Sequence, residues 1–301
     1  PFSVPALMSG SLAIALLFNS ASYIGFEATT IYSEEAKDPK RTVPRATYLA
    51  LAVIGIFYTV TTWLMVNAQS TNTDELQQHL GEMKPDPTGF LFEIAGTYVG
   101  DWLVTVMSFL FATSVFAALL AFHNAVARYL YALGREGLVP ESLGRTHSLH
   151  LSPHMGSLSQ SVLALLVVGL FIVTGQDPVL ALFTWLTQLG TLAILYLMAL
   201  SSLAVLFFFG RHPELDSNIW RTKIAPALGF LSMTGVAIFA TSQFGNLISS
   251  PDSPLAWILP GLIVVAAVAG VVSAQVLKGA SPELFSQMGR HRGEELDPHN
   301  A

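Results

Sequence analysis

Long apolar runs recur along this chain, and they constrain its fold more than any other feature of the sequence. A helix needs about 20 consecutive apolar residues to cross about 30 Å of hydrocarbon. Of the 301 residues, 52% are hydrophobic and 11% are charged, whereas an ordinary soluble domain carries about 25% charged residues. The sequence therefore predicts an all-α, polytopic bundle of membrane helices in a single transmembrane domain. Seven spans are expected, at 11–33, 46–67, 101–131, 157–174, 178–209, 226–248 and 255–277.

Basic side chains fall almost entirely on one side of these expected spans. Of the 14 Lys and Arg residues, only Lys84 lies in a loop on the opposite side. We expect the chain to lie in the plasma membrane. Because cytoplasmic loops are enriched in Lys and Arg, we expect its N-terminus outside the cell and its C-terminal tail, 278–301, in the cytoplasm. The basic residues on the expected cytoplasmic side are Lys37, Lys40, Arg41, Arg45, Arg128, Arg135, Arg145, Arg211, Arg221, Lys223, Lys278, Arg290 and Arg292.

Composition and spacing also exclude several classes of function. The formal net charge is -6, and no basic cluster is present, so no nucleic-acid partner is expected. Cysteine is absent, and this excludes disulfides and thiolate metal sites. His147, His150 and His154 lie close in sequence, but Pro153 interrupts their helical spacing and no carboxylate completes a metal-ligand set. With no catalytic pair inside the spans, we expect neither an enzyme nor a resident metal or cofactor.

The first expected span is polar at its centre. After the apolar run SLAIALLF (11–18), the stretch NSASYIGFE (19–27) brings polar side chains, a glycine and a carboxylate to membrane depth. An ionised carboxylate there costs about 2.5–3.5 kcal/mol on insertion scales, so Glu27 is expected to serve a partner, a pathway or a proton. Two plainer alternatives stay open. Glu27 lies about 10 Å before Glu34 along a helix and can reach water at the inner vestibule, and Gly25 can serve a close helix contact.

An interruption at this depth has a chemical consequence. A broken helix leaves carbonyl groups unpaired at the end of its first half and amide groups unpaired at the start of its second half. Exposed carbonyls around Asn19 to Ser22 suit an ammonium group, and amides after Gly25 favour an anion. The sequence therefore predicts a ligand with a cationic amine.

Three segments resemble one known family. The stretch SYIGFEATTIYSEEAKDPKRTVPRA (22–46) is similar to the sixth transmembrane helix and following loop of amino acid permeases, in the amino acid-polyamine-organocation superfamily. Asn124, Arg128 and YALGREGLVP (131–140) resemble the end of that family's eighth helix, and Ser152-Pro153 resembles the start of its ninth. The resemblance covers essentially the whole chain. It implies the second half of a five-plus-five inverted-repeat transporter fold plus two extra helices, the sixth to the twelfth, with the first five helices absent.

The resemblance also implies a half-site for substrate. The break would hold the substrate's α-ammonium through backbone carbonyls, while the carboxylate would be held by the missing N-terminal five-helix half. Glu27 would act in gating or coupling. Some relatives that exchange cationic amino acids place a large aromatic where this chain has Ala21, which argues against an arginine-type substrate. The implied substrate-binding residues are Ala21, Ser22, Tyr23, Ile24, Gly25, Phe26 and Phe122, with Tyr23 and Phe26 at a gate or pocket wall.

These observations predict a secondary active transporter that moves amino acids or related amines across a lipid membrane by alternating access. The chain is expected to be part of a longer one, with H+ or Na+ as the coupling ion. The alternative is a seven-helix receptor or binding protein without transport. No lysine lies inside a span to carry a retinal Schiff base, and without cysteine no disulfide can tie an outer loop to the bundle.

Other polar groups in the spans leave two interpretations open. Arg128 and Arg135 share a helical face. Their side chains either snorkel to the inner membrane interface or brace the inner end of this helix against Glu34 and Glu35. Gln188, Gly190 and Thr191 interrupt the apolar pattern of the fifth span, and either face the pathway or form a packed small-residue interface. Thr113 and Ser114 offer hydroxyls to a sodium ion or bond back to their own helix.

Overall fold

A computed structural model describes residues 12–31, 36–69, 89–147, 149–150 and 152–288. All regular structure in these described residues is helical. The chain divides into two compact units. The first contains the described residues from Gly25 to Gln160, and the second contains those of 12–24 and 161–288.

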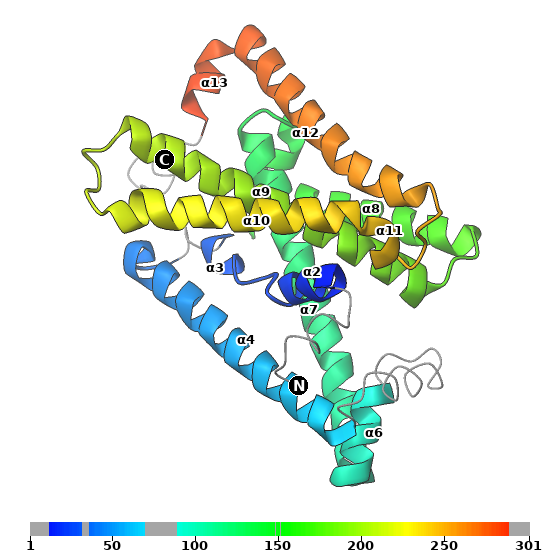
Figure 1. Cartoon of the computed structure of the whole chain (residues 1–301). Helices are drawn as coiled ribbons and strands as arrows, with labels where there is room; N and C mark the ends of the chain where they lie inside the picture. Colours follow the sequence, from blue (N-terminus) through cyan, green and yellow to red (C-terminus); the bar gives the residue numbers. More distant parts are fainter. Residues whose placement is uncertain (1–11, 32–35, 70–88, 148, 151, 289–301) are drawn as a thin grey trace. The chain divides into compact units, whose positions relative to one another are not determined.

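The first unit is built around one long helix, α7 (Asp101–Arg135). The short α6 (Gly89–Tyr98) contacts both α7 and α4 (Pro39–Gln69), so it joins these two long helices (Figure 1). The four-residue α3 (Ala28–Ile31) also contacts both α4 and α7. A 3₁₀ turn, η2 (Glu141–Gly144), packs against α7, and the first turns of α8 (His154–Val173) complete the unit.

One stripe of α7 packs unusually closely against the segments that follow it. Gly134 lies against η2, where an added Cβ would come within 2.9 Å of the Cα atom of Gly144. One end of α8 meets the same stripe at Ala127, and a Cβ on Gly156 would lie 3.2 Å from the Ala127 Cα atom. Ala127 and Gly134 are buried. Glycines at these positions therefore allow backbone-to-backbone contact, as in other membrane helix pairs.

The second unit consists of helices that pack on α9 (Thr184–Arg211). In Figure 1, α9 and α10 (Ala225–Ser242) lie side by side, and they share the most extensive helix contact of the unit. The half-helix α2 (Leu12–Ser22) contacts α9, α10 and α11 (Phe244–Leu247). The remaining elements are the π-helical turns η3 (Pro178–Phe183) and η4 (Trp220–Ile224), α12 (Leu255–Ala280) and α13 (Pro282–Gln287).

The core of the second unit forms where α2 meets α9, α10 and α11. Leu17 of α2 is 0% exposed and packs in one cluster with Leu192, Ala237 and Phe244. Packing removes these side chains from the surrounding solvent or lipid. An isolated helix of eleven residues is too short to be stable, so this burial holds the half-helix in place.

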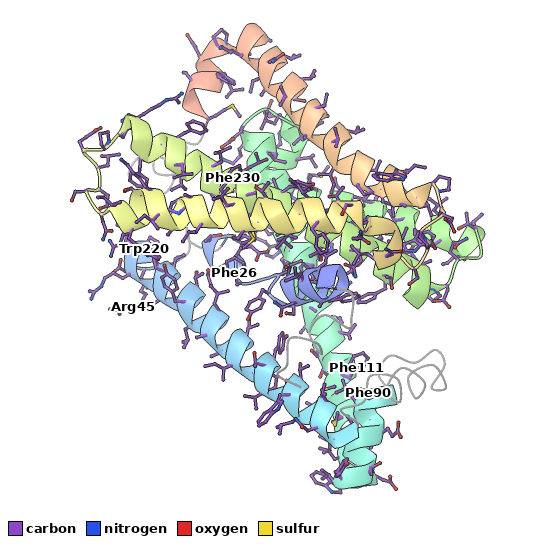
Figure 2. The ribbon with its side chains drawn as sticks, viewed as in Figure 1. Phe26, Arg45, Phe90, Phe111, Trp220 and Phe230 are labelled. Carbon is purple, nitrogen blue, oxygen red and sulfur yellow. The ribbon has the colours of Figure 1, made fainter. Side chains whose placement is uncertain are left out.

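In the described part of the chain, six helices are long and apolar enough to cross a membrane: α4, α7, α8, α9 with the end of η3, α10 with η4, and α12. Large apolar side chains project outward along them, as Phe111 does from α7 in Figure 2, where it is 49% exposed. Exposed apolar side chains of this size are compatible with surrounding lipid and unfavourable in water. The chain is a multi-pass, all-helical membrane protein.

The structure differs from expectation in three places. The expected span 11–33 is two helical pieces, and residues 32–33 lie outside the described part. Pro44 lies inside α4 rather than between helices, because α4 begins at Pro39, and as the sixth residue of the helix it leaves one intrahelical hydrogen bond unmade. The expected span 226–248 is also divided, because α10 ends at Ser242 and α11 begins at Phe244.

Candidate functional site

The break in the first expected span lies between α2 and α3. The helix ends at Ser22 and resumes at Ala28, with residues 23–27 in a turn. Gly25 has φ 111°, a backbone conformation that side-chain-bearing residues rarely adopt. A Cβ at Gly25 would meet no atom within 4 Å. The glycine is therefore required by the backbone conformation and not by lack of space.

Backbone carbonyls are left free at the end of α2. The last turn tightens, so the amides of Tyr23 and Ile24 donate to the carbonyls of Ser20 and Ala21, at 3.2 and 3.1 Å. Within the described residues, the carbonyl oxygens of Ser22, Tyr23 and Ile24 accept no hydrogen bond. These groups overlap the expected stretch 19–22 only at Ser22, because local turns satisfy the carbonyls of Ser20 and Ala21. Three free carbonyls at a helix C-terminus form a partly negative surface.

Glu27 is the last residue of the same turn. Its Oε2 atom accepts a hydrogen bond from the Gly25 amide at 2.8 Å. The amide and the hydroxyl of Thr30 both donate to the Glu27 carbonyl, at 2.8 and 2.6 Å. The anion expected next to the freed amides is thus supplied by the chain itself, and the carboxylate stabilises the turn that Gly25 makes possible.

A pair of hydroxyls fixes the second half of the broken span, and sequence reasoning missed it. The Oγ1 atoms of Thr29 in α3 and Thr47 in α4 are 2.6 Å apart. The Thr29 hydroxyl also lies 3.2 Å from the Phe26 carbonyl oxygen, and the Thr47 hydroxyl lies 2.9 Å from the Val43 carbonyl oxygen. Because each hydroxyl has one proton, one of the two threonines donates to the other rather than to its carbonyl. No motif links these threonines in the sequence, since the contact depends on how α3 folds back onto α4.

The aromatic residue predicted on the eighth-helix face, Phe122, is 53% exposed on α7. Tyr129, seven residues further on, lies within electrostatic reach of Glu27. Residues seven apart share one helical face, so Phe122 lies about 10 Å from Tyr129 along that face. The first unit therefore contains Gly25, Phe26 and Glu27 together with Phe122, while Ala21 to Ile24 belong to the second unit.

Comparison with known proteins decides the family. The family model for amino acid permeases matches residues 3–278. The chain belongs to the amino acid permease family. It is 29% identical over 214 residues to the branched-chain amino acid permease BcaP of Lactococcus lactis, covering 70% of this chain and 42% of that protein.

Two further relatives carry other substrates in their names. The permease chain is 26% identical over 251 residues to the low-affinity putrescine importer PlaP of Escherichia coli, covering 82% of this chain and 50% of that protein. It is 25% identical over 232 residues to the methylthioribose transporter of Bacillus subtilis, covering 77% and 45%. The chain spans about half the length of the curated relatives it matches. No solved structure matches it.

Arg128 and Arg135 lie near the end of the permease's α7, where the sequence predicts contacts with Glu34 and Glu35. The Arg135 guanidinium carbon lies 5.6 Å from the centre of the Tyr131 ring, a cation–π contact at the helix end. Glu34 and Glu35, the predicted partners of Arg128 and Arg135, lie outside the described residues. The proposed brace therefore stays a prediction.

Hydroxyl and amide groups in the permease's other spans either bond back to their own helix or are buried. Thr113 donates to the carbonyls of Phe109 and Leu110, at 3.2 and 2.9 Å, which favours back-bonding over a sodium site. Gln188 and Thr191 are 0% and 1% exposed in the second unit. Their burial favours a packed interface over a position facing the pathway.

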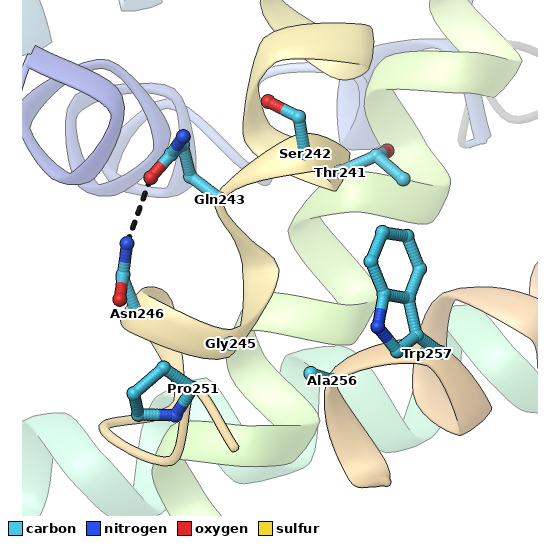
Figure 3. Close-up of a pocket in the computed structure, with 8 residues that line it drawn as sticks. All are labelled: Thr241, Ser242, Gln243, Gly245, Asn246, Pro251, Ala256 and Trp257. Atoms are coloured by element: carbon cyan, nitrogen blue, oxygen red, sulfur yellow. Dashed lines mark hydrogen bonds between the residues drawn. The ribbon is translucent and has the colours of Figure 1, made fainter. Parts of the chain in front are cut away.

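The histidine group and a small cavity complete the candidates in this permease. The rings of His147 and His150 stack at 5.0 Å, and His147 Nδ1 accepts from the amides of Leu149 and His150. No group of three His, Asp or Glu side chains in the described ranges could hold a metal ion. Figure 3 shows a cavity of about 100 Å³, which has room for a few water molecules. It is lined by Thr241, Ser242, Gln243, Gly245, Asn246, Pro251, Ala256 and Trp257.

Proposed function

We propose that this chain is part of a secondary active transporter that moves amino acids or related amines by alternating access. The observation that carries the proposal is the set of free carbonyls at Ser22, Tyr23 and Ile24, next to a turn held by Gly25 and Glu27. Membership in the permease family and the names of the relatives support it.

The substrate's ammonium group is proposed to bind at the end of α2. An ammonium carries three donors, and three neighbouring carbonyls at a helix C-terminus offer acceptors and a favourable dipole. Tyr23 lies within the three-carbonyl segment and Phe26 lies two residues after it. The side chains of both residues are proposed to close over the bound substrate. The substrate carboxylate is proposed to bind in the N-terminal five-helix half, which lies outside this chain.

The proposed architecture is the second half of a five-plus-five repeat with two extra helices. In this arrangement α2 and α3 together make a seventh crossing, in addition to the six long helices. The basic residues place the C-terminal tail in the cytoplasm and the N-terminal end of α2 towards the outside. A broken helix at the membrane midplane gives one site that each side can reach in turn, as alternating access requires.

Glu27 is proposed to couple the movement of the break to an ion gradient. Its carboxylate holds the Gly25 amide at 2.8 Å, and a charge-assisted hydrogen bond of this kind weakens when the carboxylate is neutralised. Protonation of Glu27 would therefore loosen the turn that positions the carbonyls. Either H+ or Na+ can drive such a cycle.

The test is exchange transport by the complete native protein in proteoliposomes, with labelled L-leucine, L-lysine and putrescine as separate probes. We expect saturable counterflow of at least one probe, and a loss of about tenfold in Gly25→Ala, because the substitution strains the turn by about 1–3 kcal/mol. Gly169→Ala is the matched control, since a Cβ there also meets no atom within 4 Å and the backbone is helical. Saturable binding without flux would favour the receptor alternative, and neither binding nor flux would refute the proposal.

A further inference from the structure

One ionisable residue inside the spans has no part in the site described above. His123 lies in α7, and it is the one titratable side chain between Asp101 and Arg128. It lies twelve residues before Arg135, or about 18 Å along the helix, within the hydrocarbon. Ionisable residues at such depth are rare and mark pathways or proton relays by default.

His123 has a defined polar partner among the described residues. Its Nε2 atom lies 2.8 Å from the Oγ atom of Ser157, in the second turn of α8. His123 shares the α7 stripe of Ala127 and Gly134, since residues four and eleven apart lie on one face. The imidazole therefore lies at one end of the close-packed seam where Gly156 meets Ala127.

A serine hydroxyl suits an imidazole that changes its protonation state. When Nε2 is bare, the hydroxyl can donate to its lone pair, and when Nε2 carries a proton, the hydroxyl can turn and accept. No backbone movement is needed for this exchange. A carboxylate partner would instead hold the imidazole in its charged form.

We infer that His123 is a proton-binding site of the transport cycle, with Ser157 as its switchable partner. This inference rests on the proposed function. An imidazole exchanges a proton near neutral pH, which other side chains with ordinary chemistry do not. The proton enters from water onto the imidazole ring and leaves from the same ring after the conformational change, so the chain returns unchanged. Because Phe122 is the next residue along α7, the proton site borders the predicted pocket face without lying on it.

Other titratable groups surround this point and must be separated from it. His154 lies three residues before Ser157 on α8, and Arg128 lies five residues after His123 on α7. On the elements that contact α7, the break carries Glu27, α6 carries Glu93, and η2 carries Glu141 with its salt-bridge partner Arg145 at 3.4 Å. His123 differs from the carboxylates and arginines in being an imidazole, and from His154 in lying in the interior of a span rather than at its first residue.

The experiment compares two kinds of transport in proteoliposomes that hold the complete native protein. Accumulation driven by an imposed inward proton gradient requires net proton movement, whereas counterflow exchange does not. The probe is the one among L-leucine, L-lysine and putrescine that wild type exchanges fastest. We expect His123→Gln, which keeps a hydrogen-bonding side chain but cannot titrate, to lower accumulation about tenfold and counterflow about threefold or less. His154→Gln is the matched control and should change both by less than about twofold.

Ser157→Ala keeps the imidazole and removes its partner, so we expect gradient-driven accumulation to survive with a displaced dependence on pH. Wild-type accumulation by His123→Gln, an equal loss of both activities in that variant, or a superimposable pH dependence in Ser157→Ala would each overturn the inference. Counterflow without gradient-driven accumulation in wild type would overturn it as well, while leaving the proposed function intact. If wild type exchanges none of the three probes, the proposed function has failed and this inference falls with it.

Discussion

Replacing Gln188 with methionine should stabilise the protein. The Gln188 side chain is 0% exposed in α9, and neither its Oε1 nor its Nε2 atom has a hydrogen-bond partner among the described residues. It lies one turn before Leu192, whose side chain belongs to the buried cluster of the second unit. Methionine has a similar length and removes both polar atoms, so it fits the same space without the desolvation cost.

The size of the effect follows from the two unpaired atoms. Each buried group left without a partner costs about 1–3 kcal/mol. The unfolded chain in a membrane also finds partners for its polar groups, and this lowers measured differences to about 1 kcal/mol per group. We therefore expect Gln188→Met to gain about 1–3 kcal/mol, or a rise of about 2–5 °C in melting temperature.

Intrinsic tryptophan fluorescence during heating measures this directly in detergent. Trp185 packs against the same cluster, so its emission follows the local structure. Gln275→Met is the matched control, because Gln275 is exposed on α12 and its amide can reach polar groups at the surface. A melting temperature below wild type in Gln188→Met, with Gln275→Met unchanged, would refute the reasoning and show that Gln188 makes hydrogen bonds in the native protein.

Three further outcomes are expected in the complete native protein. Glu27→Gln keeps an acceptor for the Gly25 amide but no charge, so coupled uptake should fall more than equilibrium binding of the probe. Uptake and a pH response equal to those of wild type would refute the coupling role of Glu27. Thr29→Val removes the hydroxyl contact to Thr47 and should cost about 0.5–1.5 kcal/mol in thermal stability, with Thr61→Val, a back-bonded surface threonine, as the control. Gly156→Leu should cost at least about 1–3 kcal/mol by overpacking the α7–α8 crossing; an unchanged melting temperature would show that the helices separate easily there.

Much of the fold was predictable from local properties. Apolar runs are a property of composition over about 20 residues, so helices α4, α7, α8, α9, α10 and α12 lie close to the expected spans. The break was predictable for the same reason, because a glycine between polar residues at membrane depth is a local signal. The structure moved its free carbonyls to Ser22 through Ile24, since 3₁₀-type turns satisfy the earlier ones.

The polar residues at Gln188 to Thr191 show where local reasoning stops. They interrupt the apolar pattern of the span, and α9 continues through them. A helix satisfies its own backbone, so polar side chains on one face do not break it when the neighbouring helices cover that face. Sequence alone could not tell an interior position from one that faces a pathway.

The sequence by itself determined that this chain enters a lipid membrane, that its first helix is broken near Gly25, and that it belongs with amino acid permeases. Each of these three conclusions depends on a local property of the sequence: the hydropathy, the backbone preference or the motif of a short segment. Tertiary structure alone decided the rest: the Thr29–Thr47 contact, the buried Gln188 and the pairing of His123 with Ser157. These depend on which helix faces cross at which residues, and side-chain packing sets that geometry over the whole chain.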